Sequence, residues 1–354
     1  MRAITVTPGT PGSAKVEEVP EPPLTDGPVI VDTLAIGICG TDREIISGKY
    51  GSPPPGRSRL ILGHESVGRV HDAPIGAEFK KGDLVVGIVR RPDPEPCPNC
   101  AVGEWDMCRN GAYTERGIKG RDGFASELYS SHPEFLVRID PSLEPVGFLV
   151  ETASVLAKAW EHIDRIGNRA HWNPARVLVT GAGPVGLIAA LMGVQRGLEV
   201  HVLDRVETGP KPRLVKELGA HYHLGAPEAA CHLPDIVIEC TGVGEIVFDV
   251  IGHTAPGGII CLTGVSSGRR SLRIDPTRLN RTLVLENEVI FGSVNANRRH
   301  YELGAASLLK ANPSWLQGLI TRRVPIERWQ EAIERGTDEV KTVIDFKNTR
   351  RDLS

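Results

Sequence analysis

A glycine-rich stretch in the second half of the chain has the residue spacing of a phosphate-binding turn. It covers residues 176–205 and reads RVLVTGAGPVGLIAALMGVQRGLEVHVLDR. A β-branched run precedes Gly181, Gly183 and Gly186, an apolar helical run follows them, and a second strand-like run ends at Asp204. The glycines allow a tight turn, a close approach to a pyrophosphate and close helix–strand packing, and a helix N-terminus offers free N–H groups to phosphate. The stretch predicts a nicotinamide-dinucleotide site in which Asp204 accepts from a ribose hydroxyl.

Four residues outside this stretch are candidate ligands of a catalytic metal ion. A catalytic zinc takes three protein ligands of the Cys, His or carboxylate type and keeps one open position. Cys39 offers a thiolate, His64 an imidazole, and Glu65 or Glu151 a carboxylate. Spacing alone leaves the ordinary alternative open, in which Cys39 is a small buried residue and the His–Glu pair has no ligand.

Three cysteines form a second candidate metal site. Cys97, Cys100 and Cys108 are spaced C-x2-C-x7-C, which is typical of a structural zinc that needs a fourth ligand. Asp93 is the nearest upstream oxygen donor and is the expected fourth ligand. The alternative is a loop of reduced thiols without metal.

The composition excludes several function classes. The chain has 354 residues, 40% hydrophobic and 24% charged, with a formal net charge of −3. This charge does not point to nucleic acid or an anionic membrane as a partner. We see no apolar run long enough to cross a bilayer and no signal peptide, so the cytoplasm is the expected location. Clustering of three of the seven cysteines favours metal over disulfides.

The order of apolar runs predicts an α/β protein with two domains. A Gly/Pro-rich β-domain is expected over residues 1–155, completed by 305–354, and a parallel-sheet domain over 156–304. Residues 37–42 are expected to form a turn, and 90–123 a long loop that metal ties down. Strands are expected at 3–6, 29–34, 67–70, 82–89, 128–139, 177–179, 199–203, 235–239, 258–262, 288–291 and 341–346, and helices at 151–166, 187–194, 298–310 and 324–335.

The order of these motifs resembles the medium-chain, zinc-dependent alcohol and polyol dehydrogenases over essentially the whole chain. Within them it is most similar to the archaeal type of glucose 1-dehydrogenase. The residues that carry the closer resemblance are Val89-Arg90-Arg91, the stretch 115–124, Glu151 at the start of a helix, Gly292-Ser-Val-Asn295 and His300-Tyr301.

The resemblance implies a GroES-like β-rich catalytic domain plus a Rossmann domain with a doubly wound parallel sheet. It implies that Cys39, His64 and Glu65 hold a catalytic zinc, with Glu151 as a further ligand or a substrate contact. Sugar hydroxyls would be bound by Thr41, Glu115, Glu151 and Asn295. The expected coenzyme contacts are Gly181, Gly183, Pro184, Val185, Gly186, Asp204, Arg205, Thr241, Thr263, Gly264, Val265, Ser293, Val294 and Asn295.

The sequence departs from this family pattern at two places. The structural zinc of the family has four cysteines, and Pro94 stands where the first should be. Related enzymes that prefer NADP carry a neutral residue and basic partners where this chain has Asp204-Arg205. Asp204 would repel a 2′-phosphate and favours NAD, while Arg205 leaves NADP as a second coenzyme.

The expected activity is oxidation of D-glucose at C1 to gluconolactone with NAD(P) and a catalytic zinc. Zinc would lower the pKa of the alcohol, and Thr41 would start a proton relay to water. The nearest alternative is a dehydrogenase of another polyol, such as sorbitol, threitol or a cyclitol. A zinc-free quinone or enone reductase would lack the Cys39 and His64-Glu65 motifs, and a non-enzymatic nucleotide-binding scaffold would need no open metal position. The resemblance also implies a homo-oligomer, either a dimer or a tetramer.

Overall fold

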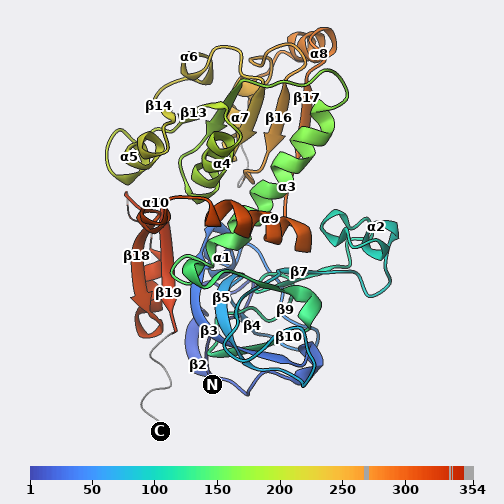
Figure 1. Ribbon diagram of the computed structural model, residues 1–354, viewed down its shortest axis with the longest axis vertical. Coiled ribbons are helices and arrows are strands. Elements are labelled where there is room, and N and C mark those ends of the chain that lie inside the picture. The colour runs from blue at the N-terminus through green and yellow to red at the C-terminus, as the bar shows by residue number, and fades with distance from the viewer. Residues whose placement is uncertain (267–270, 335, 337, 347–354) are drawn as a thin grey trace. The chain divides into compact units, whose positions relative to one another are not determined.

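The computed structural model describes residues 1–266, 271–334, 336 and 338–346. The chain divides into two compact units (Figure 1). The first unit contains Met1–Ser154, Asn295–Lys310 and Ile320–Ser354, and the second contains Val155–Val294 and Ala311–Leu319. Helix α3 (Leu149–Gly167) begins in the first unit and continues into the second.

The chain returns to the first unit at Asn295, earlier than the expected position 305. Helix α9 (Arg298–Leu309) belongs to the first unit because it packs closely on the start of α3. A Cβ atom on Gly304 would lie 2.8 Å from the backbone nitrogen of Ser154, so only glycine permits this approach. Close packing of this kind binds α9 to the first unit.

The first unit is built around a seven-stranded sheet of order β11-β6-β5-β3-β19-β18, with β10 also paired to β3. Strand β3 begins with alternating buried and partly exposed residues and is fully buried at its end, where β5 and β19 flank it. The strands of this unit are β1 (Arg2–Val6), β2 (Lys15–Glu18), β3 (Val29–Ile38), β4 (Leu60–Ile61), β5 (Glu65–Asp72), β6 (Leu84–Gly87), β7 (Arg90–Arg91), β8 (Thr114–Arg116), β9 (Gly120–Arg121), β10 (Leu128–Ser131), β11 (Leu136–Arg138), β18 (Ile320–Pro325) and β19 (Lys341–Asp345). Its other helices are α1 (Gly40–Ile46), α2 (Pro98–Ala101) and α11 (Trp329–Ile333).

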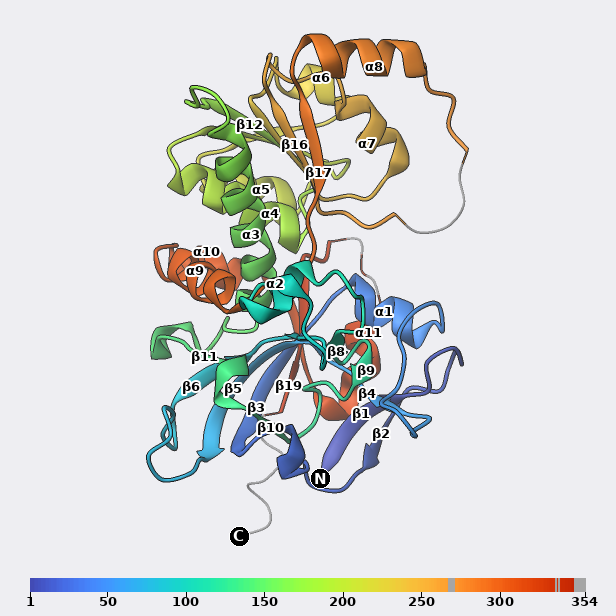
Figure 2. The same ribbon diagram turned by 90° about the vertical axis from the view of Figure 1, so that its right-hand side faces the viewer.

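The second unit is a six-stranded parallel sheet of order β14-β13-β12-β15-β16-β17. Helices α4 and α5 lie on one face and α7 on the other (Figure 2). Because both faces are covered, the central strands read as continuous apolar runs. The strands are β12 (Arg176–Thr180), β13 (Glu199–Leu203), β14 (His221–His223), β15 (Ile236–Glu239), β16 (Ile259–Leu262) and β17 (Val289–Gly292), and the helices are α4 (Pro184–Gln195), α5 (Pro210–Glu217), α6 (Pro227–Ala230), α7 (Gly244–Val250), α8 (Pro276–Leu285) and α10 (Pro313–Gly318).

Four local expectations need correction. Residues 324–335 were expected to be helical throughout, but Val324 and Pro325 end β18, which pairs in parallel with β19; Arg335 lies outside the described residues. The expected strand 128–139 is two strands, because Pro133 starts a 3-10 turn between them. The expected turn at 37–42 includes the start of α1. The 90–123 loop contains three short strands and α2.

No helix among the described residues is long and apolar enough to cross a membrane.

Candidate active site

Three of the expected metal ligands meet in the first unit. Cys39 directly follows β3 and caps α1, where its sulfur accepts from the Thr41 amide at 3.2 Å. His64 lies directly before β5, and its Nε2 is 3.1 Å from the Cys39 sulfur. Glu65 is the first residue of β5, and one donor atom from each of these three residues lies within 4.8 Å of the others. A thiolate, an imidazole and a carboxylate at this spacing form a donor set that suits zinc.

Asp42 is a buried acid behind this donor set. Its side chain is 0% exposed, accepts from the Cys39 amide at 2.9 Å and lies 3.4 Å from His64 Nδ1. Burial acts to raise the pKa of Asp42, but His64 and the Cys39 amide outweigh it and the pKa is lowered. Burial acts to lower the pKa of His64, but the negative charges of Cys39 and Asp42 raise it well above its ordinary value. The site is therefore electronegative and favours a cation.

Lys341 supplies a buried positive charge beside Glu65. Its ammonium group forms an ion pair with Glu65 Oε2, and the two side chains are 1% and 3% exposed. A Cβ atom on Gly37 would lie 2.2 Å from the same oxygen, so glycine at this position leaves room for the carboxylate. Lys341 comes from β19, which pairs with β3. The C-terminal segment thus completes the site.

Glu151 lies near the donor set but is not one of the three clustered donors. It stands in the first turn of α3. Burial, together with the like charge of Glu65, raises its pKa to about 7. Glu151 is thus close enough to Glu65 for their charges to interact, but it lies outside the group of three donors. Thr41, on α1, is partly buried.

Glu115 and Asn295 are in direct contact within the first unit. Asn295 Nδ2 donates to Glu115 Oε1 at 2.7 Å. The same oxygen accepts from Arg90 Nη2 at 2.9 Å, and the Arg90 guanidinium stacks on Tyr113 with its carbon 3.7 Å from the ring centre. Asn295 has a positive φ of 62°, a conformation that asparagine tolerates better than most residues. Arg90 therefore orients Glu115, and Glu115 in turn accepts from Asn295.

The glycine turn in the second unit has the geometry that its sequence predicts. Gly181 has a φ of +91°, and a Cβ atom on Gly186 would lie 1.8 Å from the Gly181 carbonyl oxygen. Pro184 and Val185 open α4, and the N-cap Gly183 makes no side-chain cap, so the first N–H groups of the helix are open to an anion.

Asp204, at the end of β13, is held by groups on both of its oxygens. Oδ2 accepts from the Ala182 amide at 2.7 Å and from Lys211 at 3.0 Å, and Oδ1 accepts from the Arg205 amide at 2.8 Å. Burial acts to raise the pKa of Asp204, but the Ala182 amide and Lys211 outweigh it, so the pKa is lowered. Asp204 therefore stays ionised beside a lysine that the sequence analysis missed.

A buried carboxylate, Glu239, organises the loops at the carboxyl ends of three neighbouring strands. It is 0% exposed and accepts from Thr180 Oγ1 at 3.2 Å, from the Thr241 amide at 2.7 Å and from the Gly242 amide at 3.1 Å. Its backbone oxygen accepts from the Thr263 and Gly264 amides. The end of β12, just before the glycine turn, and the loops after β15 and β16 are therefore joined through one residue.

The remaining expected nicotinamide contacts lie on the last two loops of this sheet. Val265 and Val294 are 78% and 59% exposed. The Val294 carbonyl accepts from Lys158 at 3.0 Å, and the Ser293 amide donates to Leu262 at 2.9 Å. Exposed apolar side chains on an anchored backbone suit the packing of a flat ring.

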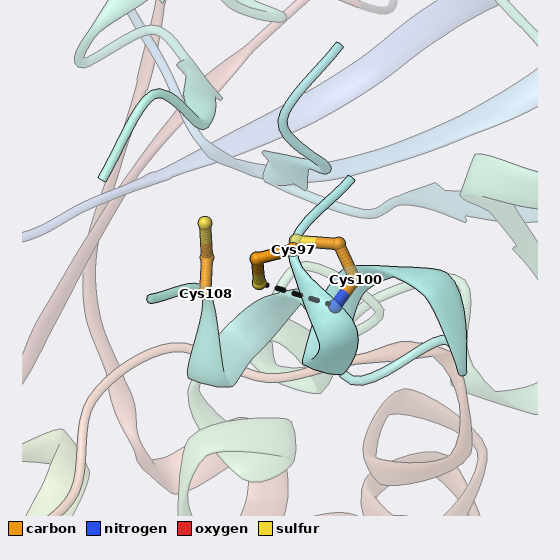
Figure 3. A group of neighbouring side chains, drawn as sticks. All are labelled: Cys97, Cys100 and Cys108. Atoms are coloured by element: carbon orange, nitrogen blue, oxygen red, sulfur yellow. Dashed lines mark hydrogen bonds between the residues drawn. The ribbon is translucent and has the colours of Figure 1, made fainter. Parts of the chain in front are cut away.

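The second expected metal site is a compact cluster of three sulfurs (Figure 3). Cys97 caps α2 and Cys100 lies within it. The sulfur atoms of Cys97, Cys100 and Cys108 all lie within 4.8 Å of one another. Amide donors, first that of Arg109, lower the pKa of Cys97 to about 6, and burial raises that of Cys100 to about 11. Among the described residues Asp93 is not part of this group, and its Oδ1 accepts from the Glu95 amide at 2.9 Å.

Sequence reasoning missed five buried or partly buried charges at these sites: Asp42, Arg90, Lys211, Glu239 and Lys341. The spacing of Cys39 and Asp42, an N-cap followed by an acid three residues later, is the one local signal among them, because it is the spacing of a capping box. Arg90 and Lys341 act through partners far away in the sequence. Lys211 and Glu239 also contact residues nearby in the sequence, but no recognised spacing marks these contacts.

Two family models match the chain. The "Alcohol dehydrogenase GroES-like domain" matches residues 25–141, and the "Glucose dehydrogenase C-terminus" matches residues 144–346. The fold class expected from the resemblance, a GroES-like domain plus a Rossmann domain, is thereby confirmed.

Relatives match along nearly their whole length. A glucose 1-dehydrogenase of Methanocella arvoryzae is 38% identical, over 98% of this chain and 99% of its own. One of Thermoproteus tenax is 40% identical, over 97% and 99%. A solved structure of Haloferax mediterranei glucose dehydrogenase in complex with NADP, Zn and gluconolactone is similar with a TM-score of 0.91 and 33% identity, over 98% of this chain and 99% of that chain. The chain therefore belongs to the glucose 1-dehydrogenase family.

Proposed function

We propose that the protein oxidises D-glucose at C1 to gluconolactone, with NAD or NADP as hydride acceptor and with a catalytic zinc. The observation that carries this proposal is the meeting of Cys39, His64 and Glu65 within 4.8 Å in a family whose Haloferax member is solved with NADP, Zn and gluconolactone. When bound, zinc supplies a Lewis acid that lowers the pKa of an alcohol. Three protein donors leave a position open for the substrate.

The sugar-binding role is assigned to Glu115 and Asn295. Both contacts described above fall on Glu115 Oε1, so we assign Oε2 to sugar hydroxyls. A carboxylate accepts more than one hydroxyl hydrogen bond, which suits a polyhydroxylated substrate. The ion pair with Arg90 fixes the position of Glu115, so that the carboxylate accepts without moving.

Proton removal is assigned to Thr41, and Glu151 is assigned to the substrate side of the donor set. The Thr41 hydroxyl lies next to the Cys39 turn and passes the hydroxyl proton of the sugar toward water. Glu151, whose pKa is raised to about 7 by burial and Glu65, is able to hold a proton near neutral pH. A further role as a zinc ligand is open to it, as the resemblance implies.

Coenzyme selection is assigned to Asp204, Arg205 and Lys211. An ionised Asp204 disfavours a 2′-phosphate and accepts from a free 2′-hydroxyl, so NAD is the preferred coenzyme. Lys211 and Arg205 offset this charge and allow NADP to be used. The glycine turn from Gly181 to Gly186 would hold the pyrophosphate.

The test is a spectrophotometric assay of the purified protein for NADH and NADPH formation. D-glucose is compared with D-galactose, D-xylose, sorbitol and ethanol, with and without a chelator. We expect fast reduction with glucose, loss on chelation and recovery with zinc. If the protein turns over only another polyol, that polyol replaces glucose as the proposed substrate. If protein that holds zinc and binds coenzyme turns over none of these compounds, the proposal is overturned.

We also propose a homo-oligomer, dimer or tetramer, acting in the cytoplasm. Strand β17 ends the parallel sheet and its apolar residues are half-buried. None of the residues of the adjoining helix α8 is buried, and Val284 and Leu285 are 63% and 59% exposed. An edge strand and an apolar helix of this kind favour a second copy as partner. All seven cysteines are free thiols, as a reducing compartment requires.

A further inference from the structure

We propose that His201 and His223 form a binding site for one divalent transition-metal ion, of the class of Ni²⁺, Cu²⁺ or Zn²⁺. The two residues lie on β13 and on the neighbouring edge strand β14 of the parallel sheet. Neither belongs to the donor sets described above, and the site is independent of the proposed reaction.

The register of the two strands brings the imidazoles together. His201 is paired with His221 in the parallel ladder, and His223 is two residues further along β14, so all three side chains project from one face. His201 Nδ1 lies 2.9 Å from His223 Nε2. Two nitrogens that bind one metal ion at right angles, each at about 2.1 Å, are separated by about 3 Å. The pair is therefore already spaced for chelation.

Glu199 fixes which nitrogen of His201 is available. His201 Nε2 lies 3.2 Å from Glu199 Oε1. An ionised carboxylate only accepts hydrogen bonds, so the proton of neutral His201 resides on Nε2 and the lone pair on Nδ1 faces His223. Metal-binding histidines commonly donate their other N–H to a carboxylate, which orients the ring and raises its basicity. This arrangement is present in the metal-free protein.

The surroundings also favour the neutral form of His223, which is the form that binds metal. Burial, together with the neighbouring His201 and His221, lowers the pKa of His223. The three rings form a compact triangle, with the His201 ring centre 5.0 Å from that of His221 and 5.1 Å from that of His223, and the last two 6.4 Å apart. When His201 Nδ1 and His223 Nε2 bind a metal ion, the proton of neutral His223 moves from Nε2 to Nδ1 through solvent, and water completes the coordination of the ion.

His221 is the matched control, because it belongs to the same histidine group but lies at its rim. Its side chain is 58% exposed, and its Nε2 is 4.0 Å from Glu199 Oε1. Among the described residues, His221 belongs to no group of three or more candidate metal ligands whose donor atoms lie within 4.8 Å of one another. Replacing it removes a surface imidazole and leaves the chelating pair intact.

The experiment is calorimetric titration of the zinc-loaded protein with Ni²⁺, which imidazole binds well. We expect wild type and His221→Asn to bind Ni²⁺ at one site with similar micromolar affinity. His201→Asn and His223→Asn should each weaken this binding at least tenfold, with unchanged far-ultraviolet circular dichroism. Equal affinity in wild type and His201→Asn, or no binding at millimolar Ni²⁺, would overturn the proposal.

A second measurement on wild type does not depend on the folding of variants. Diethyl pyrocarbonate modifies unprotonated imidazoles, and mass spectrometry locates the modified residues. We expect Ni²⁺ to protect His201 and His223 by at least fivefold and to leave exposed His221 modified. Equal modification of all three histidines with and without Ni²⁺ would contradict the site.

Discussion

At the residue scale, the donor set depends on charges that stand behind it. Asp42 lies against His64, and Lys341 is paired with Glu65. The charges of Asp42 and Lys341 are both buried. Each is compatible with a stable fold only while its partner is present, because an unpaired buried charge is strongly destabilising. These two residues hold the ring of His64 and the carboxylate of Glu65 in place.

Replacing Lys341 by Met should destabilise the protein by about 3–5 kcal/mol, because Glu65 would become an unpaired buried carboxylate. Denaturant unfolding of the zinc-free protein measures this loss without a contribution from zinc. Lys341→Arg, which keeps the charge, should retain more of the stability. Equal stability of wild type and Lys341→Met would show that the pair is not coupled to folding.

Replacing Cys39 by Ala should remove the catalytic zinc and nearly all turnover, since it deletes one of the three clustered donors. Coenzyme binding should change little, because the glycine turn belongs to the other unit. Elemental analysis and coenzyme titration measure the two effects, with Cys231→Ala as the control for loss of a buried thiol. Normal turnover by metal-free Cys39→Ala protein would contradict the assignment of Cys39 as a ligand of a catalytic zinc.

At the element scale, the loops that we assign to the coenzyme are joined through a side chain as well as through the strands. Glu239 ends β15 and accepts from the end of β12 and from the loop that follows β15. Separately, a Cβ atom on Gly264 would lie 2.8 Å from Glu239 Oε2, so the loop after β16 approaches the same carboxylate. One carboxylate thus sets the relative positions of three loops.

Glu239→Gln should raise the KM for the coenzyme about tenfold, because the new NH₂ group faces amide donors and leaves one of them unpaired. The kcat at saturating coenzyme should change less, since Glu239 touches none of the zinc donors. Glu288→Gln is the matched control, another buried glutamate of the same unit, which accepts from Thr254 at 2.8 Å. An equal KM change in both variants would indicate a general loss of packing.

The loop that carries Cys97, Cys100 and Cys108 is a second feature at the element scale. A bound metal ion would stabilise this short segment in the way that a hydrophobic core stabilises a larger one. If zinc occupies it, the purified protein should hold about two zinc ions per chain and Cys100→Ser about one. Cys261→Ser, at a buried thiol in the second unit, should retain both. A single zinc ion in wild type, unchanged in Cys100→Ser, would leave the loop a set of reduced thiols.

At the scale of the whole molecule, the proposed homo-oligomer would assemble through the edge of the parallel sheet. Strand β17 has one neighbour in the described sheet, and α8 carries exposed apolar residues. A sheet edge with unpaired N–H and C=O groups is a ready surface for another strand.

Leu285→Glu should convert the proposed oligomer to a monomer, because it places a charge in an apolar contact. Light scattering coupled to size-exclusion chromatography measures the mass at micromolar concentration. Ile75→Glu is the control, since Ile75 is a fully exposed residue of the other unit. A monomeric wild type under the same conditions would contradict the interface.

Much of the fold and part of the site were open to prediction from the sequence, because the signals are local. The glycine turn is one: strand, Gly181, helix and Asp204 follow one another within one βαβ unit, so their spacing carries their geometry. Their residue types made Cys39 and His64-Glu65 candidate donors, and the resemblance made them the expected zinc ligands. The family, fold class and activity class of the protein followed from the resemblance of these motifs to those of the zinc-dependent dehydrogenases.

The tertiary structure alone decided which distant residues complete the sites. Lys341 reaches Glu65 because β19 pairs with β3, and Asn295 reaches Glu115 because the chain returns to the first unit there. Val324 is in a strand, against its helical pattern, because β18 pairs with β19. Ladder pairing and buried ion pairs join residues far apart in the sequence, and a local pattern does not record which partner a side chain will meet.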